Sequence, residues 1–519
     1  MTDKTSTDVA ARADALLAAF TPDRPGLAVL VARGGETLYE RYLGGADLEH
    51  GVAVSAATRF HVASVSKQFT AFAAVQLSHA GKLDLEADIR TWLAEMPDFG
   101  QPITVSNLIH HTSGLRDQWE LMMLSGTPLD GLIRQKAILA MAARQTALNF
   151  SPGTDFCYSN TGYSLLAEIV ARASGVKFHQ YLQDQVFAPL GMDDTVVYGN
   201  ANQLLKRRAA SYGLGADGAV RLMRLNYSNY GATSLQSTPR DLLKWSREIL
   251  HPAVFDPALM ASLEVPGRLR DGRVLTYAAG LALDPIGGRP AVWHSGADAG
   301  YRSMLISFPD QDASIVVLSN GAADTGKISA DLADIFLGPA APAAETVAAD
   351  EAALTALAGY YVGDWGTSLD LKLEDGKLVT TLYGARAEAR FLADGRFRLG
   401  PGSEPYARRA DGAIETRSLG GVTTAWRPAR RAAPSAGQLA ALAGDYRCEE
   451  LDVTYTLMPS EGGMLMSSLR SNPVALAAAD EDHFEGGGVR LSVTRGAGGE
   501  AVGFTIATGR VRGLAFRRL

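Results

Sequence analysis

A helical pattern begins at Ser64-Val65-Ser66-Lys67-Gln68-Phe69-Thr70 and ends at Gly81. Positions i and i+3 of a helix lie on one face, so the Ser64 hydroxyl and the Lys67 amine can meet. The positive end of the helix dipole and partial burial would both lower the pKa of Lys67, which would make its amine a base able to activate a serine. Taken alone, the Ser-x-x-Lys spacing is also typical of a solvated helix start, and its meaning depends on context.

A second motif, Tyr158-Ser159-Asn160, lies between Pro152-Gly153 and the helical run Tyr163–Ala173. A tyrosine at a loop-to-helix junction can present its hydroxyl to a serine, and the Asn160 amide can hydrogen-bond a substrate. The alternative is a turn tyrosine followed by an asparagine that caps the helix.

A third motif, His294-Ser295-Gly296, ends a strand pattern that starts at Pro290. Small residues after the histidine let a substrate backbone approach the strand edge. By itself, His294 is as well explained by a hydrogen-bonded histidine of the core or of a sheet edge. Three such motifs in this order, each at the predicted kind of junction, together indicate one active site.

The first two thirds of the chain predict one α/β unit with a helical lobe. Strand patterns occupy Gly26–Ala32, its hairpin partner Glu36–Leu43, and then Arg289–His294, Tyr301–Phe308 and Ala313–Ser319, with a closing helix at Ile328–Leu337. Between about residues 58 and 250 the pattern is mainly helical. We therefore assign residues 1–340 to this unit.

Residues Gly338–Asp350 are rich in proline and alanine and are typical of a linker. After it, Leu354-Thr-Ala-Leu-Ala-Gly359-Tyr-Tyr361 recurs 85 residues later as Leu439-Ala-Ala-Leu-Ala-Gly444-Asp-Tyr446. Two copies of short alternating strands predict two similar all-β domains, 351–430 and 436–519, rather than a solenoid.

Composition limits the class of protein. The chain has 519 residues, of which 47% are hydrophobic and 20% are charged, and its formal net charge is −7. These values predict two or three domains and exclude a disordered or collagen-like chain, and the acidic balance argues against a nucleic-acid partner. We find no signal-peptide pattern and no membrane-length apolar run, so we expect a cytoplasmic protein that does not bind membranes.

Cysteine and histidine usage bears on metals and thiol chemistry. The two cysteines, Cys157 and Cys448, cannot build a disulfide framework or a cysteine-rich zinc site. Cys157 is interpreted as a small buried hydrophobe, and the adjacent His110-His111 as structural, because neighbours in a helix do not face one metal. We expect no cofactor and no metal, which leaves the chemistry to serine.

Ser64-x-x-Lys67, Tyr158-x-Asn160 and His294-x-Gly296 resemble the three motifs of the penicillin-recognising serine hydrolases, over about residues 20–340. This family includes class C β-lactamases, D-Ala-D-Ala carboxypeptidases, D-aminopeptidases and related esterases. The segments His111–Leu115, Ser113–Asp117 with Trp119, and Ser237–Asp241 are also similar, and the likeness is greatest to three-domain D-aminopeptidases. It implies a serine β-lactamase/transpeptidase-like domain, with an antiparallel sheet, flanking helices and a helical lobe, followed by two small antiparallel lipocalin-like β-barrels.

The resemblance also implies roles for the motif residues. Ser64 would attack a carbonyl, Lys67 and Tyr158 would share the proton transfers, and His294 would hold the Tyr158 hydroxyl or polarise the site. Asn160 and Gly296 would contact the substrate. The backbone N–H groups of Ser64 and Ala297 would form the oxyanion hole.

Two departures from the family pattern affect the expected substrate. His-Ser-Gly replaces the Lys-Thr-Gly of most β-lactamases, which makes antibiotic hydrolysis a poor first expectation. D-aminopeptidases extend a loop from the last barrel to the active site, and the region Arg470–Val489 is too short to provide it.

Three functions remain open from the sequence. The first is a peptidase or amidase acting on peptides or amides with D-residues. The second is a carboxylesterase or a peptide-cyclising thioesterase on the same scaffold, because the fold does not fix the acyl acceptor. The third is a binding protein that has lost catalysis, against which the intact Ser64, Lys67 and Tyr158 count. The expected partner is a small peptide, amide or ester, and a homo-oligomer is compatible with the barrels.

Overall fold

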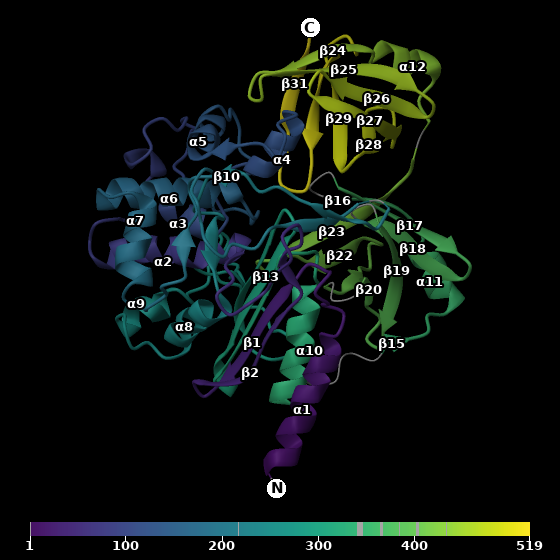
Figure 1. Ribbon diagram of the computed structural model, residues 1–519. Helices are drawn as coiled ribbons and strands as arrows, with labels where there is room; N and C mark the ends of the chain where they lie inside the picture. The colour runs from purple at the N-terminus through teal and green to yellow at the C-terminus, as the bar shows by residue number, and fades with distance from the viewer. Residues whose placement is uncertain are drawn as a thin grey trace.

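The computed structural model describes residues 2–215, 217–339, 346–363, 367–382, 385–400, 404–431 and 433–519. A sheet with helices on both faces carries a helical lobe on one side, and two β-barrels follow it along the chain (Figure 1). The predicted α/β unit with a helical lobe and two antiparallel barrels is therefore confirmed.

The central sheet has five antiparallel strands in the order β12-β13-β14-β1-β2. Their bounds are Leu27–Arg33 (β1), Glu36–Leu43 (β2), Val292–Asp298 (β12), Tyr301–Phe308 (β13) and Ala313–Ser319 (β14). The sheet joins the two ends of this part of the chain, since Leu27 pairs with Ser319. β12 continues four residues past the predicted end at His294, because Gly296 has no side chain to clash with the segment beside it.

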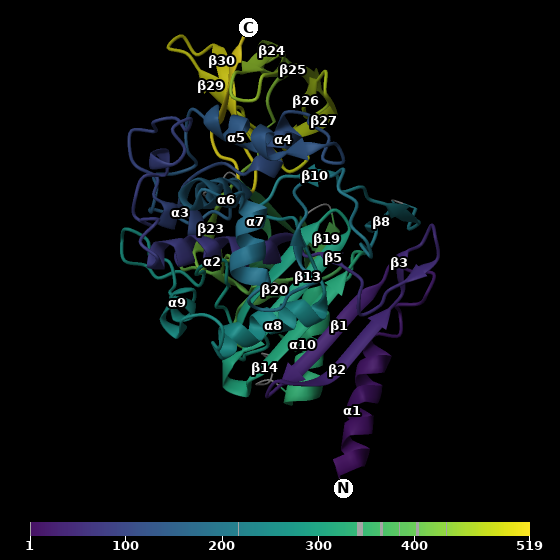
Figure 2. The ribbon, with the colours of Figure 1, turned by 60° about the vertical axis from the view of Figure 1, so that its left-hand side comes forward.

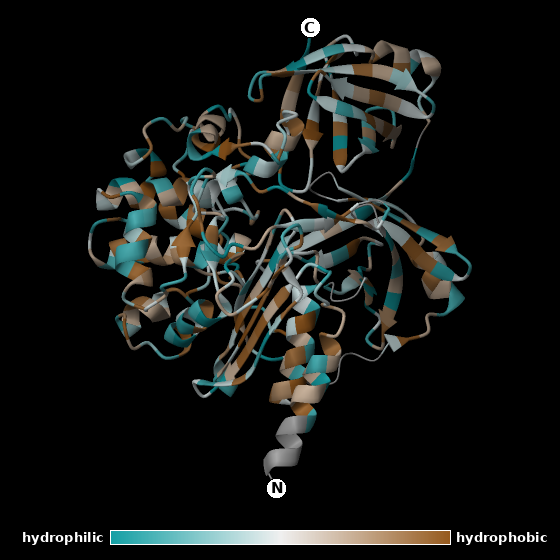
Figure 3. Cartoon of the chain, in the orientation of Figure 1, coloured by the Kyte–Doolittle hydropathy of each residue, from teal (hydrophilic) through white to brown (hydrophobic). Residues whose placement is uncertain are grey.

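Both faces of the sheet are covered, which explains the continuous apolar run of β1. Leu27, Val29 and Val31 face a core shared with α1 (Thr2–Leu16) and α10 (Thr325–Leu337). Ala28 and Leu30 face the larger core on the other side, with α8 (Pro239–Leu250) and α2 (Ser66–His79). In Figure 3 the apolar residues of β1 and its neighbouring strands are coloured brown.

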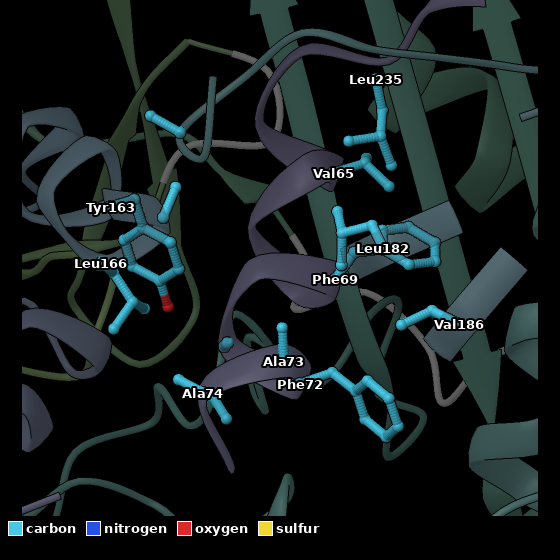
Figure 4. Close-up of a cluster of buried hydrophobic side chains, with 14 of the residues drawn as sticks. Val65, Phe69, Phe72, Ala73, Ala74, Tyr163, Leu166, Leu182, Val186 and Leu235 are labelled. Carbon is cyan, nitrogen blue, oxygen red and sulfur yellow. The ribbon is translucent and has the colours of Figure 1, made fainter. Parts of the chain in front are cut away.

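The helical lobe is built around α2, whose residues from Ser66 to Val75 are all buried. Its apolar side chains pack against Trp245 of α8. They belong to the same core as Tyr163 and Leu166, which Figure 4 shows beside the helix. The surrounding helices are α3 (Val105–Ile109), α4 (Gln118–Leu124), α5 (Gln135–Ala143), α6 (Asn160–Ser174), α7 (Phe178–Leu182) and α9 (Pro257–Ser262). Short strands interrupt the predicted helical stretch: β5 (Phe60–His61), β6 (Ile133–Arg134), β7 (Val196–Val197), β8 (Tyr212–Leu214), β9 (Val220–Leu222), β10 (Tyr227–Ser228) and β11 (Leu235–Ser237).

The first barrel is a ring of eight antiparallel strands, closed where β19 pairs with β20. The strands are β16 (Gly359–Gly363), β17 (Ser368–Glu374), β18 (Lys377–Leu382), β19 (Ala385–Leu392), β20 (Phe397–Leu399), β21 (Tyr406–Arg408), β22 (Ile414–Arg417) and β23 (Thr423–Ala429), preceded by α11 (Glu351–Leu357). β15 (Thr346–Val347) pairs with β19 and belongs to the predicted linker, of which residues 340–345 lie outside the described part.

The second barrel is closed by β24 (Gly444–Cys448), β25 (Val453–Ser460), β26 (Gly463–Ser468), β27 (Ser471–Ala478), β28 (His483–Gly486), β29 (Val489–Arg495), β30 (Ala501–Ala507) and β31 (Leu514–Arg518), after α12 (Ala436–Ala441). The sequence repeat has a structural counterpart. The Tyr361 hydroxyl donates to the Leu357 carbonyl at 2.9 Å, and Tyr446, 85 residues later, donates to Leu442 at 2.8 Å. Each hydrogen bond ties the first strand of a barrel to the helix before it.

The second barrel lies against α4 and α5 of the helical lobe (Figure 2). Leu121 and Met122 of α4 and Ile138 of α5 share one hydrophobic core with the interior of the barrel. The Tyr455 hydroxyl also donates to the Leu124 carbonyl at 2.6 Å. The barrel and the lobe are therefore joined by a core and not only by a surface contact.

Candidate active site

Ser64 lies in a single 3-10 turn, Ala63–Val65, which leads directly into α2. The residue before it, Ala63, has φ of +46°, a left-handed conformation that costs about 1–3 kcal/mol for a residue with a side chain. Ser64 keeps part of its surface exposed, whereas its neighbours Ala63 and Val65 are buried. The fold thus holds an accessible serine on a strained turn in front of a buried helix.

Lys67 follows one turn later and is fully buried. Its Nζ lies 3.0 Å from Ser64 Oγ, 2.8 Å from Asn160 Oδ1 and 2.8 Å from the Ala232 carbonyl. Burial lowers the pKa of Lys67 to about 7, against the opposing effect of the Asp298 and Asp117 carboxylates. A neutral amine has two N–H groups and one lone pair, and two acceptors take the N–H groups here, so the lone pair is left to Ser64.

Asn160, the first residue of α6, lies between Lys67 and Asp117. While its Oδ1 accepts from Lys67, its Nδ2 donates to Asp117 Oδ2 at 2.8 Å, and its backbone N–H donates to the same oxygen at 2.7 Å. The amide predicted to meet the substrate is thus already engaged on both sides. Asp117 is fully buried, and no sequence motif marks it as a site residue, although it ends the family-like segment Ser113–Asp117.

Tyr158 precedes α6, and Lys67 Nζ lies 4.8 Å from the centre of its ring. Burial raises the pKa of Tyr158, against the opposing effect of the Ser64 side chain, and so disfavours the phenolate. The ring packs on His111 at a centroid distance of 4.3 Å, and His111 Nδ1 accepts the Ser159 N–H at 3.0 Å. His111 thus has a structural role, as the sequence predicts, and the residue that it supports, Tyr158, belongs to the active site.

His294 is held by two hydrogen bonds. Its Nδ1 lies 2.6 Å from the Ser295 carbonyl and its Nε2 lies 3.0 Å from the Tyr277 hydroxyl. Because a carbonyl can only accept, the partners assign the proton to Nδ1, and Nε2 accepts from Tyr277. Burial lowers the pKa of His294 to about 3, so the imidazole is neutral. The resemblance implies that His294 holds the Tyr158 hydroxyl or polarises the site; its hydrogen-bond partner is Tyr277, and the centroid of the Tyr158 ring lies 6.0 Å from that of His294.

Gly296 brings the edge strand β12 against the serine turn. A Cβ at Gly296 would lie 2.4 Å from the Val62 carbonyl and 2.9 Å from the Ser64 nitrogen. The next residue, Ala297, is exposed, and it pairs with Arg302 of β13, whereas the bridge on the other side of β12 lies at Trp293, with Ala282. This arrangement leaves an open strand edge beside the backbone N–H of the nucleophile.

Asp298 ends β12 and fixes it to the lobe. Its carboxylate lies 3.0 Å from His61 Nε2 and accepts from the Thr233 hydroxyl. Asp298, Tyr277 and Arg510, a residue of the second barrel beside Asp117, are site residues without a sequence signal, because their partners come from distant segments. No group of three potential metal ligands was found in the part of the chain that the structure describes.

Comparisons with known proteins identify the family of this chain. The Beta-lactamase family model matches residues 10–338. The D-aminopeptidase of Gluconobacter oxydans (strain 621H) is 28% identical over 479 residues, covering 90% of this chain and 87% of that protein. Penicillin-binding protein 4* of Bacillus subtilis (strain 168) is 29% identical over 381 residues, covering 69% of this chain and 83% of that protein.

Among solved structures, the octameric penicillin-binding protein homologue from Pyrococcus abyssi superposes with a TM-score of 0.58 at 19% identity. The superposition covers 82% of this chain and 100% of that chain. It supports the fold, including the part after the sheet and lobe. With the family model spanning more than half of its length, the chain belongs to the Beta-lactamase family and is a serine hydrolase.

Proposed function

We propose that this protein hydrolyses amides or peptides of D-amino acids through an acyl-enzyme on Ser64. The observation that carries the chemistry is the buried Lys67 amine, 3.0 Å from Ser64 Oγ with its N–H groups engaged elsewhere. The substrate class is supported by the D-aminopeptidase relative, which aligns across 90% of the chain.

In the proposed reaction, Ser64 Oγ attacks the carbonyl carbon and Lys67 accepts the hydroxyl proton. Lys67 is the better base of the two candidates, because its pKa of about 7 leaves it partly neutral at pH 7, whereas the raised pKa of Tyr158 keeps that group protonated. The N–H groups of Ser64 and Ala297 stabilise the oxyanion. Tyr158 passes the proton on to the leaving amine, and a water molecule then hydrolyses the ester.

His294 and Gly296 act indirectly in this scheme. Neutral His294 orients Tyr277 at the wall of the site, and Gly296 allows β12 to bring the Ala297 N–H close to Ser64. Asn160 orients Lys67, and a direct contact between Asn160 and the substrate stays a prediction of the sequence.

The experiment compares D-alanine and L-alanine p-nitroanilides with p-nitrophenyl butyrate. We expect faster turnover of the D-anilide than of the L-anilide, and a loss of turnover of more than about 10³-fold in Ser64→Ala.

A second experiment uses a labelled fluorophosphonate, which should modify Ser64. The matched control is Ser66, whose Oγ accepts from the Leu235 N–H, and the Ser66→Ala variant should still be labelled. Turnover of the ester alone would favour the carboxylesterase, and full activity of Ser64→Ala would refute the assignment.

Two further expectations remain part of the proposal. A homo-oligomer would be detected by light scattering of the full chain, and a cytoplasmic location by fractionation of the producing cell. Within the described residues, no helix is long and apolar enough to cross a membrane.

A further inference from the structure

The second barrel reaches the active site through the loop between β30 and β31, residues 508–513. Thr508 Oγ1 and the Arg510 backbone N–H both donate to the Glu120 carboxylate, the latter at 2.6 Å. The Arg510 carbonyl accepts from Asn149 Nδ2 at 3.0 Å and from the Asp117 N–H at 3.3 Å. This loop, and not the Arg470–Val489 region considered from the sequence, connects the last barrel with the site.

The Arg510 side chain forms two ion pairs at the N-terminal end of α4. Its Nε lies 3.0 Å from Glu120 Oε1 and its Nη2 lies 3.3 Å from Asp117 Oδ1. Asp117 Oδ2 takes both N–H donors of Asn160, whose Oδ1 in turn accepts from Lys67. An unbroken series of contacts thus runs from the second barrel to the amine beside Ser64.

We propose that Arg510 is a positioning residue of the active site, which through Asp117 and Asn160 holds the Lys67 amine against Ser64 and makes the second barrel a working part of the catalytic centre. The inference rests on the proposed use of Ser64 and Lys67, and it does not depend on which acyl substrate is hydrolysed.

The positive charge of Arg510 has a second effect, which is on the pKa of Lys67. A fully buried carboxylate such as Asp117 is costly without a compensating cation, and its charge favours the protonated form of a nearby lysine. Lys67 is faced by the carboxylates of Asp117 and Asp298, which raise its pKa, and by Arg510, which lowers it. The aromatic residues around it are neutral: Tyr158 and Tyr163 lie under Nζ, and burial keeps the imidazoles of His111 and His294 uncharged. Arg510 therefore offsets part of the rise that the two carboxylates cause in the pKa of Lys67.

The test measures the rate at which a fluorophosphonate phosphonylates Ser64, with loss of fluoride, in the full-length protein as a function of pH. In Arg510→Met we expect the acid limb of the rate-against-pH profile to move to higher pH by about 0.5–1 pH unit, because the pKa of Lys67 rises. At pH values below that pKa the labelling rate should therefore be about 3–10-fold lower than in the wild type. Arg510→Lys should return most of the shift because it keeps the charge. Arg512→Met is the matched control in the same loop; its guanidinium lies 3.5 Å from Asp155, and the limb should stay in place.

Asp117→Asn provides a test of opposite sign, because removal of the carboxylate should move the limb to lower pH. In the double variant Asp117→Asn/Arg510→Met, the acid limb should stay close to its position in Asp117→Asn alone if Arg510 acts through Asp117, whereas simple cancellation of the two shifts would show independent effects and would count against the proposal. If Arg510→Met does not fold, Arg510→Lys and Asp117→Asn carry the test. An unchanged profile in Arg510→Met, or a uniform loss at all pH values, would overturn the proposal.

The labelling assay separates this inference from the proposed function. Failure to hydrolyse D-anilides with normal labelling of Ser64 would refute only the substrate class. Hydrolysis of D-anilides with a pH profile independent of residue 510 would refute only the role of Arg510. Loss of labelling in the wild-type protein would refute both.

Discussion

Lys67 shows how strongly a side chain's surroundings decide its chemistry. An exposed lysine is protonated at neutral pH, whereas Lys67 is enclosed by α2, α6 and the segment around Ala232. Burial is the main cause of its lowered pKa, and the polar contacts that remain are those a neutral amine can satisfy. The same residue on an exposed helix start would be a surface cation without catalytic use.

We expect the pH dependence of kcat/KM to report this group. The reactive form of Lys67 is neutral, so the rate should fall about tenfold per pH unit below pH 7 and level off above it. Lys67→Arg should be inactive at every pH, because a guanidinium does not lose its proton in this range. A profile that is flat between pH 5 and pH 8 would contradict the assignment of Lys67 as the base.

We expect neither cysteine to react with thiol reagents in the folded protein. Burial raises the pKa of Cys157 to about 12 and that of Cys448 to about 11, so the thiolate is scarce at neutral pH. Iodoacetamide at pH 7.5 should leave activity unchanged and modify neither thiol in the folded protein, as read by mass spectrometry. The control is the urea-unfolded chain, in which both should react; rapid inactivation of the native protein would show that Cys157 is accessible.

At the scale of elements, the site is assembled at one strand edge and two helix starts. β12 provides His294 to Asp298, the turn before α2 provides Ser64, and the segment before α6 provides Tyr158. Ser159 caps α6 by accepting the Gly162 N–H, so the alternative that Asn160 caps the helix is wrong. The close approach of β12 to the serine turn depends on Gly296.

Gly296→Ala should separate the strand from the nucleophile. The added methyl group would lie 2.4 Å from both the Val62 carbonyl and Ser303 Oγ, a distance that requires the backbone to move. We expect kcat to fall by more than about 10²-fold, comparable to the loss of an oxyanion-hole donor. Ser295→Ala, on the same strand with an exposed side chain, is the control and should retain activity; near-normal turnover in Gly296→Ala would mean that β12 does not form the oxyanion site.

At the scale of the whole molecule, the helical lobe and the second barrel form one structural body. They share a hydrophobic core and a buried ion pair, in which Arg116 Nη1 lies 2.6 Å from Glu450 Oε2. Thr146 donates to the other oxygen of Glu450 at 2.6 Å. Since Arg116 adjoins Asp117, the interface and the active site use neighbouring residues.

Glu450→Ala should be strongly destabilising, because it leaves the Arg116 guanidinium buried without its partner. We expect the free energy of unfolding to drop by about 3–5 kcal/mol in urea titrations followed by circular dichroism. Glu388→Ala in the first barrel is the matched control, since its ion pair with Lys377 is exposed and should contribute less than about 1 kcal/mol. Equal effects of the two substitutions would show that the lobe and the second barrel are not coupled through this pair.

The sequence by itself determined what depends on short spacings and on repeated pattern. Ser64 and Lys67 are three residues apart and must share a helix face, the apolar run of β1 must be covered on both sides, and the repeat must give two similar barrels. Only the tertiary structure decided the contacts between distant segments: Lys67 with Asn160 across 93 residues, His294 with Tyr277 instead of Tyr158, and Arg510 with Glu120 across 390 residues. The physical reason is that helix and strand periodicities fix neighbours within a few residues, whereas the burial that lowers the pKa of Lys67 arises only when α2, α6 and the segment around Ala232 pack together.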